Sequence, residues 1–222
     1  MDIVLYFFPK ACSRVTMTAL EKIGLDYRGE VINIFDGQSK SPEYLKVHPD
    51  GKVPALSVNG EVITENVSIL LYLARAYPEA GLLPGADNPV AQAQAISDLI
   101  WCGGTLHPLV RQIRMPIRFT DGDPSGVREK GMESVTAVFE RVGQRFESQP
   151  WWFGDQWSIV DVYFAWACGI AESGGFPIME YPWIAEHRSR LEALQYYSRA
   201  LAKEDAALEK YNIVMPPPMK PG

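Results

Sequence analysis

The spacing of hydrophobic and polar positions changes near residue 78. Before it, residues 3–8 form a continuous apolar run of strand length, and residues 27–34 give a second strand signal. Between these runs, apolar residues recur at helical spacing from residue 12 or 13 to 23. A strand, a helix and a strand in this order predict a parallel pair joined by a right-handed crossover.

A hairpin signal and a second helix complete the first part of the chain. Asn59-Gly60 separates two short strand-like runs, and this dipeptide is the strongest short signal for a hairpin. Pro54 precedes the first run, where the missing N–H of a proline is tolerated. A helical pattern over 66–77 then ends before a proline. We therefore expect a small sheet with both parallel and antiparallel pairs.

Strand signals vanish after residue 88, and long helical patterns replace them. The predicted helices begin at Asn88-Pro89, with a kink at Gly103-Gly104 and Pro108, and continue at 123–147, 158–171, 183–194 and 197–210. We accordingly predict an α/β domain over 1–78, a linker over 79–88, an all-helical domain over 89–210 and a proline-rich extended tail over 211–222.

Composition narrows the classes of function. The chain has 222 residues and a formal net charge of -6, which argues against a nucleic-acid surface because phosphate binding needs clustered basic residues. We find no secretory signal and no apolar stretch long enough to cross a membrane. Three widely spaced cysteines suit reduced thiols in a cytoplasm, and no Cys/His spacing resembles a metal site.

Two places carry candidate chemistry. Cys12 follows a buried strand at the start of a helix, where unpaired N–H groups and the helix dipole stabilise a thiolate, and Ser13 beside it offers a hydroxyl. Cys12 can equally be a small buried residue capping a core helix. Val53, held extended by the proline after it, offers backbone groups to a peptide-like ligand. The simpler interpretation of the Val53 segment is a structural turn.

Several charged residues accompany these places. Lys40 and Lys52 flank the extended segment and offer a basic pocket for an anionic ligand. Glu65-Asn66 opens a helix. The pair can serve as a structural cap of that helix, or its side chains can bind a ligand. The pattern from Ser158 to Asp161 resembles a capping box and indicates folding rather than catalysis. His107 lies at the predicted kink, ahead of arginines at helical spacing.

Together these residues resemble the cytosolic glutathione transferases over nearly all of the chain. The motifs are Val53-Pro54, Glu65-Asn66, and Ser158 to Asp161 with Gly154 upstream. The resemblance implies a thioredoxin-like domain with a mixed sheet, followed by an all-α domain, and a homodimer. It implies a cis bond before Pro54 and glutathione as co-substrate, with no metal. The implied glutathione-binding residues are Lys40, Lys52, Val53, Pro54, Glu65, Asn66 and, across the dimer, Asp98. The implied electrophile site consists of Phe8, Trp101, Arg111, Arg114 and Trp166.

The loop from Pro9 to Ser13 is similar to that of the bacterial beta class, which implies Cys12, Ser13 and His107 as the catalytic residues. The chain departs from that class at Lys10, where Gly is usual, and at Pro108, where a basic residue follows the histidine.

The implied function is activation of the glutathione thiol for attack on a small hydrophobic electrophile or a disulfide. In a variant of this mechanism, Cys12 holds glutathione as a mixed disulfide, which suits thiol transfer or peroxide reduction. The alternatives are a non-catalytic interaction module on the same fold, or a glutathione-dependent dehalogenase, isomerase or ether-cleaving enzyme.

Overall fold

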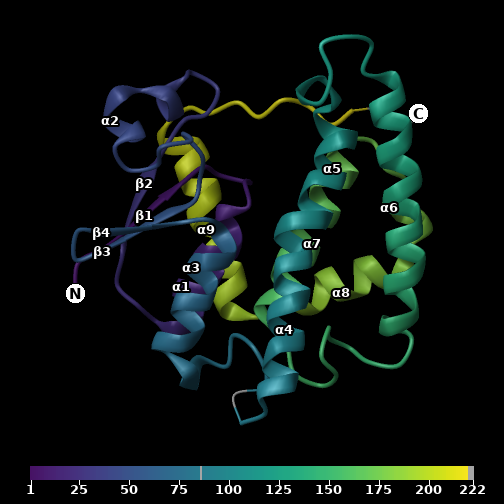
Figure 1. Ribbon diagram of the computed structural model, residues 1–222, viewed down its shortest axis with the longest axis horizontal. Helices are drawn as coiled ribbons and strands as arrows, with labels where there is room; N and C mark the ends of the chain where they lie inside the picture. Colours follow the sequence, from purple (N-terminus) through teal and green to yellow (C-terminus); the bar gives the residue numbers. More distant parts are fainter. Residues whose placement is uncertain (86, 220–222) are drawn as a thin grey trace. The chain divides into compact units, whose positions relative to one another are not determined.

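The computed structural model describes residues 1–85 and 87–219. Its helices and strands form two units that are not contiguous in sequence (Figure 1). The first unit joins Met1–Leu82 to Ala193–Val214, and the second holds Leu83–Glu192 and the tail from Met215. Residue 86 of the predicted linker and residues 220–222 of the predicted tail lie outside the described residues.

The first unit is built on a mixed sheet. Its elements are β1 (Ile3–Phe7), α1 (Ser13–Ile23), β2 (Arg28–Val31), α2 (Pro42–Leu45), β3 (Ala55–Val58), β4 (Glu61–Thr64), α3 (Asn66–Ala76) and α9 (Gln195–Lys210). The strand order is β2-β1-β3-β4. β1 pairs with β2 in parallel and with β3 antiparallel, and β3 and β4 form the predicted hairpin. The mixed sheet expected from the sequence is therefore confirmed.

The core of this unit explains the continuous apolar run at its start. β1 is a central strand, and Leu5 faces Leu56 of β3 with both side chains fully buried. Helices α1 and α3 pack against the sheet and against one another, and α9 packs along α1. Helix α1 ends at Gly24, which adopts the left-handed conformation that glycine favours at this position.

The second unit is helical, as expected. Its helices are α4 (Pro89–Trp101), α5 (His107–Arg114), α6 (Ser125–Phe146), α7 (Ile159–Ser173) and α8 (Pro182–Glu192). A π-helical turn over Cys102–Leu106 joins α4 to α5 at the glycine pair where the kink was predicted. Most side chains of α7 are buried because α4, α5 and α8 all pack against it.

The predicted capping box begins α7. Asp161 is fully buried and accepts hydrogen bonds from the N–H and the hydroxyl of Ser158 at 2.7 and 2.8 Å. Its other oxygen accepts from the Trp152 N–H at 2.7 Å and lies 3.0 Å from His187 Nε2. This carboxylate thus joins the start of α7, the loop before it and α8.

The division into units differs from the predicted domain limits at the C-terminal helix. The sequence suggested one helical domain to residue 210, whereas α9 packs with the first unit because its apolar stripe meets α1. The predicted domains are each continuous in sequence, and their limits remain a prediction. Residues 213–219 of the tail form neither helix nor strand.

Candidate functional site

The loop before β3 contains a cis peptide bond between Val53 and Pro54, as expected. Val53 lies outside the strand ladder, which begins with Ala55 opposite Tyr6. Within the described residues, the Val53 N–H has no hydrogen-bond acceptor. A residue just outside the ladder with an unused N–H offers a hydrogen bond to a peptide-like ligand, so the Val53 segment is a candidate docking edge.

Two features hold this edge in place. The Tyr44 hydroxyl donates to the Lys52 carbonyl oxygen at 2.6 Å, and burial raises the pKa of Tyr44, so the hydroxyl remains a donor. Gly51 has a φ of +61°, and a Cβ built there would lie 2.2 Å from the Ser39 carbonyl oxygen. Only glycine therefore fits the turn that leads into Val53.

The two predicted lysines meet beside this turn. Lys40 Nζ donates to the Asp50 carbonyl oxygen at 2.7 Å, and Lys52 Nζ lies 3.8 Å from the Asp50 carboxylate. Both lysines are exposed, so either ammonium group can reach an anion without losing a buried contact.

Cys12 lies at the N-terminus of α1 and against the docking edge. It is the N-cap residue of that helix, and its sulfur lies 3.6 Å from the Val53 carbonyl oxygen. The helix dipole favours negative charge at this position, and the N–H groups of Arg14 and Val15 in the first turn donate to the carbonyl oxygens of Ala11 and Cys12. The structure therefore brings together two predicted features that lie 41 residues apart in sequence.

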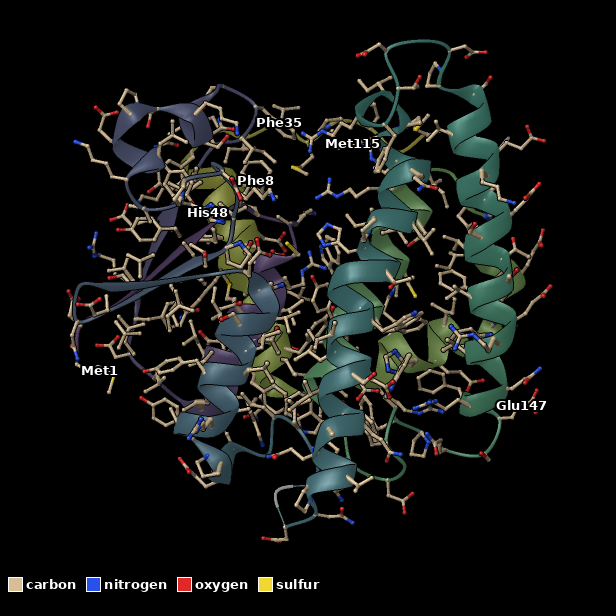
Figure 2. All side chains as sticks on the ribbon, viewed as in Figure 1. Met1, Phe8, Phe35, His48, Met115 and Glu147 are labelled. Atoms are coloured by element: carbon tan, nitrogen blue, oxygen red, sulfur yellow. The ribbon has the colours of Figure 1, made fainter. Side chains whose placement is uncertain are left out.

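Ser13 has a different place. Its side chain is fully buried, and its hydroxyl donates to the Phe8 carbonyl oxygen at 3.0 Å and accepts from the Phe8 N–H at 3.3 Å. The ring of Phe8 meets the edge of the Phe35 ring, with centroids 5.0 Å apart; both are labelled in Figure 2. The Ser13 hydroxyl thus closes the loop, and Cys12 is the group that faces the docking edge.

Glu65 and Asn66 use their side chains in different ways. Glu65 has a φ of +64°, a strained conformation for a non-glycine residue, and its exposed carboxylate forms no hydrogen bond or ion pair within the described residues. Asn66 is buried: its amide donates to the Cys12 carbonyl oxygen at 2.8 Å and accepts from the Thr16 hydroxyl at 2.6 Å. Asn66 therefore braces α1, while Glu65 remains available to a ligand.

His107 lies in the second unit and is held on both ring nitrogens. Arg111 Nε donates to Nε2 at 3.3 Å, so the ring proton resides on Nδ1, which lies 3.3 Å from the Tyr163 hydroxyl. The ring of Trp166 meets the imidazole with centroids 4.5 Å apart. Burial, assisted by the Arg111 charge, lowers the pKa of His107 to about 3. The imidazole is therefore neutral at physiological pH.

Arg114 is engaged by the tail. Its guanidinium donates to the carbonyl oxygens of Pro216 and Pro217, each at 3.3 Å. The Met219 N–H donates to the Ser173 carbonyl oxygen at 2.9 Å. The predicted electrophile-site arginine is therefore a docking point for the proline-rich segment.

Two other predicted residues lie in a separate aromatic cluster. The ring of Trp101 lies against that of Trp152 at a tilt of 31°, with centroids 5.8 Å apart. Asp98 accepts from the Trp152 indole N–H at 2.8 Å and lies 3.6 Å from Arg145. The structure does not bring Trp101 to the rings around Trp166, and the role of Asp98 across a dimer stays a prediction.

Sequence reasoning missed Glu204. It lies on the buried stripe of α9, which comprises Tyr197, Ala200, Glu204 and Ala207. The signal was a charged residue at an apolar position of a helical pattern. Its carboxylate contacts the loop that carries Cys12.

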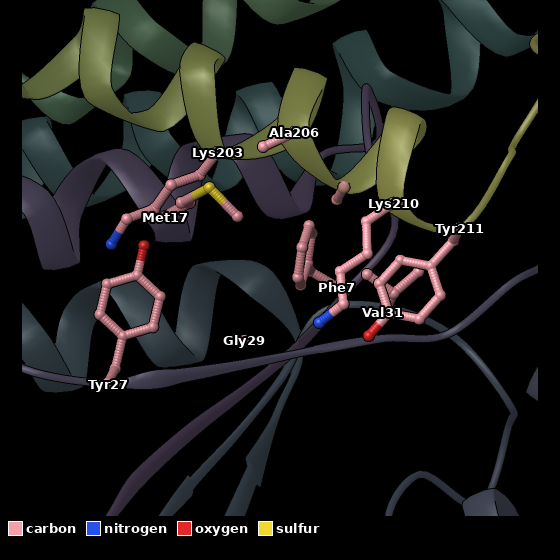
Figure 3. A pocket seen from close by; sticks show the side chains of 10 residues that line it. Phe7, Met17, Tyr27, Gly29, Val31, Lys203, Ala206, Lys210 and Tyr211 are labelled. Carbon is pink, nitrogen blue, oxygen red and sulfur yellow. The ribbon is translucent and has the colours of Figure 1, made fainter.

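A shallow pocket lies elsewhere in the first unit, between the sheet, α1 and α9 (Figure 3). It measures about 260 Å³, below the roughly 300–1,000 Å³ of usual small-molecule sites. None of its lining residues belongs to the predicted site. Among the described residues no group of acidic, histidine and cysteine side chains could hold a metal ion, and no helix has the length and apolar character needed to cross a membrane.

A sheet unit with a thiol at a helix N-terminus beside a cis-proline edge defines a thioredoxin-like protein, here completed by a helical unit. The family models for the N-terminal and C-terminal domains of glutathione S-transferase match residues 11–76 and 125–193. A maleylacetoacetate isomerase of Pseudomonas aeruginosa is 30% identical over 82% of this chain and 86% of its own length. The chain therefore belongs to the glutathione S-transferase family.

Solved structures agree with this assignment. A sphingomonad glutathione S-transferase complexed with glutathione is 26% identical, with a TM-score of 0.80, and covers 91% of this chain and 98% of its own. A bacterial beta-class enzyme of Sphingomonas chungbukensis is also 26% identical, with a TM-score of 0.80, and covers 90% of this chain and 98% of its own.

Proposed function

We propose that this chain is a glutathione-dependent transferase that places the sulfur of glutathione beside Cys12. The observation that carries the proposal is the 3.6 Å contact between Cys12 Sγ and the Val53 carbonyl oxygen. Family resemblance pairs the Val53 backbone with the cysteinyl part of glutathione. A tripeptide docked on that edge brings its own thiol to Cys12 and to the N-terminus of α1.

The first unit offers a partner for each end of the tripeptide. The exposed Glu65 carboxylate suits the ammonium group of the γ-glutamyl residue. The first-turn N–H groups of α3, which have no acceptor among the described residues, suit its carboxylate, because a helix N-terminus attracts anions. Lys40 and Lys52 suit the carboxylate at the glycine end. Asn66 then supports the site by holding Cys12 with its side-chain amide rather than by contacting the ligand.

The chemistry follows from thiol acidity. A thiol of ordinary pKa, near 8.5, is mostly protonated at neutral pH, and a helix N-terminus raises its ionised fraction. The thiolate attacks an electrophilic carbon and forms a thioether as the leaving group departs. With a mixed disulfide of glutathione as substrate, the nucleophile is instead the Cys12 thiolate, which attacks the glutathione sulfur and releases the other sulfur as a thiolate. A second glutathione thiolate then attacks the disulfide on Cys12, forms glutathione disulfide and frees the Cys12 thiolate.

Among the predicted catalytic residues, the geometry favours Cys12 over Ser13 and assigns His107 no charged role. The Ser13 hydroxyl is used within its own loop. A neutral His107, fixed by Arg111 and Tyr163, can orient a bound molecule in the helical unit without acting as a cation. We propose the beta class for the chain, supported by the cysteine in its loop and by its similarity to the beta-class structure of Sphingomonas chungbukensis.

Cys12→Ala tests the proposal. We expect it to abolish a mixed disulfide with glutathione, seen by intact mass, and to lower conjugation and disulfide reduction by at least about tenfold. Ser13→Ala is the matched control, because it removes a neighbouring hydroxyl but leaves the thiol. If Cys12→Ala retains both activities, the assignment of Cys12 is wrong. If the wild-type protein is not retained on immobilised glutathione, the chain is a non-catalytic module instead.

An isomerase is the second candidate, because a maleylacetoacetate isomerase is among the relatives that match most of the chain. In this reaction the thiolate adds to a carbon–carbon double bond and leaves again after bond rotation. Glutathione is then regenerated, whereas conjugation consumes one glutathione per product. Measuring glutathione consumption against substrate loss separates the two candidates.

We further propose a homodimer that works in the cytoplasm. Sedimentation equilibrium measures the mass directly, and a monomer at micromolar concentration contradicts the dimer.

A further inference from the structure

Glu204 of α9 reaches the loop that carries Cys12 at two points. One carboxylate oxygen accepts from the Lys10 backbone N–H at 2.8 Å. The other accepts from Arg14 Nε at 2.7 Å and lies 2.6 Å from Arg14 Nη2. Lys10 and Arg14 stand two residues before and two residues after Cys12. Glu204 therefore holds both sides of the thiol from a helix 190 residues further along the chain.

Burial makes these contacts costly to break. Glu204 is 1% exposed. Burial raises the pKa of its carboxyl group, and the Arg14 guanidinium opposes that rise. Hydrogen bonds from N–H donors to a buried carboxylate are stronger than hydrogen bonds between neutral groups. Removing one partner leaves the other buried and unpaired. The contacts of Glu204 therefore restrain the conformation of the loop around Cys12.

The loop needs such a contact at Lys10. This residue has a φ of +64°, a region that glycine enters readily and lysine does not. The backbone N–H of Lys10 donates its hydrogen bond to the Glu204 carboxylate. A strained residue persists only where its surroundings hold it.

We propose that Glu204 is a positioning residue for Cys12. By holding Lys10 in its strained conformation and Arg14 in place, it aims the thiol at the docking edge of Val53. This inference rests on the proposed function for its consequence in catalysis, but its effect on the reactivity of Cys12 is independent of glutathione.

The experiment compares full-length Glu204→Gln with the wild type by alkylation of Cys12 with iodoacetamide across pH, followed by peptide mass. Cys12 is also buried but keeps 7% of its surface exposed, whereas Cys102 and Cys168 are 0% exposed and burial raises the pKa of both thiols, so we expect Cys12 to react first. We expect the alkylation rate at neutral pH to fall about tenfold or more, because ångström-scale misplacement near a reacting atom costs up to about a hundredfold. The midpoint of the pH profile moves upward.

The direction of this change separates positioning from simple charge. Loss of a nearby negative charge alone makes a thiolate easier to form, so it would speed alkylation. A faster or unchanged rate in Glu204→Gln therefore overturns the proposal.

Glu21→Gln is the matched control. Glu21 is also a buried carboxylate between α1 and α9, paired with Arg199 and Lys203, but it does not contact the loop. We expect this variant to lose thermal stability and to alkylate at the wild-type rate. If it slows alkylation as much as Glu204→Gln does, the effect is general destabilisation and the proposal fails.

Lys10→Gly supplies a rescue. Glycine adopts the left-handed conformation without strain, so Lys10→Gly combined with Glu204→Gln should recover most of the lost alkylation rate. Should Glu204→Gln fail to fold, the double variant and Arg14→Lys, which keeps the charge but loses the two-point contact, give the same comparison. No recovery in the double variant contradicts the role of strain. A wild type without glutathione turnover but with a fast Cys12 would refute the proposed function alone.

Discussion

Asn66→Ala removes a brace from α1 rather than a ligand contact. Without the amide, the buried Thr16 hydroxyl loses its acceptor and the Cys12 carbonyl loses one of two donors, since the Val15 N–H remains at 3.0 Å. An unpaired buried group costs about 1–3 kcal/mol. The Thr16 hydroxyl can turn to the Cys12 carbonyl four residues earlier, which softens the loss. We therefore expect a loss of about 2 kcal/mol in the free energy of unfolding.

Thermal unfolding followed by circular dichroism measures this loss. For a chain of this size a loss of about 2 kcal/mol lowers Tm by about 4–8 °C. Glutathione kinetics provide the second readout: because the brace acts through the Cys12 loop, kcat should fall while the KM for glutathione changes little.

Asn88→Ala is the matched control for this prediction. Asn88 caps α4 in the second unit, where its side chain accepts from the N–H groups of Val90 and Ala91, each at 3.1 Å. Its loss should cost about 1 kcal/mol and leave glutathione kinetics unchanged. If Asn66→Ala keeps the wild-type Tm but raises the KM for glutathione, the amide is a ligand contact and the reasoning is wrong.

Three further predictions follow from single groups. His107 should titrate near pH 3 by proton NMR, not near 6.5. Because the unfolded chain binds that proton more readily than the folded chain does, His107 lowers the free energy of unfolding as pH drops from about 6.5 to about 3. Asp161→Ala should cost at least about 3 kcal/mol in chemical denaturation, because it leaves buried donors, the Trp152 N–H among them, without an acceptor; a loss below about 1 kcal/mol contradicts this. Gly51→Ala should weaken retention on immobilised glutathione, since its Cβ meets the Ser39 carbonyl oxygen; unchanged retention shows that the turn can relax.

Local signals predicted most of the fold. The Asn59-Gly60 hairpin formed where its turn chemistry required it, and both residues have positive φ angles. The strand predicted over 27–34 ends early, at Val31. β1 ends at Phe7, whose carbonyl oxygen still accepts from the Ile32 N–H at 2.8 Å. The next N–H, that of Asn33, donates to the Gln38 side chain instead of to the ladder.

The candidate site was predicted only in part. Cys12 and Val53 each carried a local signal, and the structure added their contact. Two other contacts depend on how helices pack against one another. They are the hydrogen bond from the Asn66 amide to Cys12 and the hydrogen bond from Lys10 to Glu204. A sequence pattern shows that a helix has a buried face, but it does not show which helix covers that face.

The place of α9 in the first unit has a consequence for biosynthesis. A ribosome releases the sheet, α1 and the Cys12 loop first, and the whole segment of the helical unit follows before α9 appears. At about 5–20 residues per second, the nascent loop waits on the order of ten seconds for the carboxylate that completes it. A chain interrupted at Glu192 would contain the thiol, the docking edge and every residue of Leu83–Glu192, yet leave Arg14 facing solvent. The Cys12 loop is thus among the first parts made and among the last to be finished.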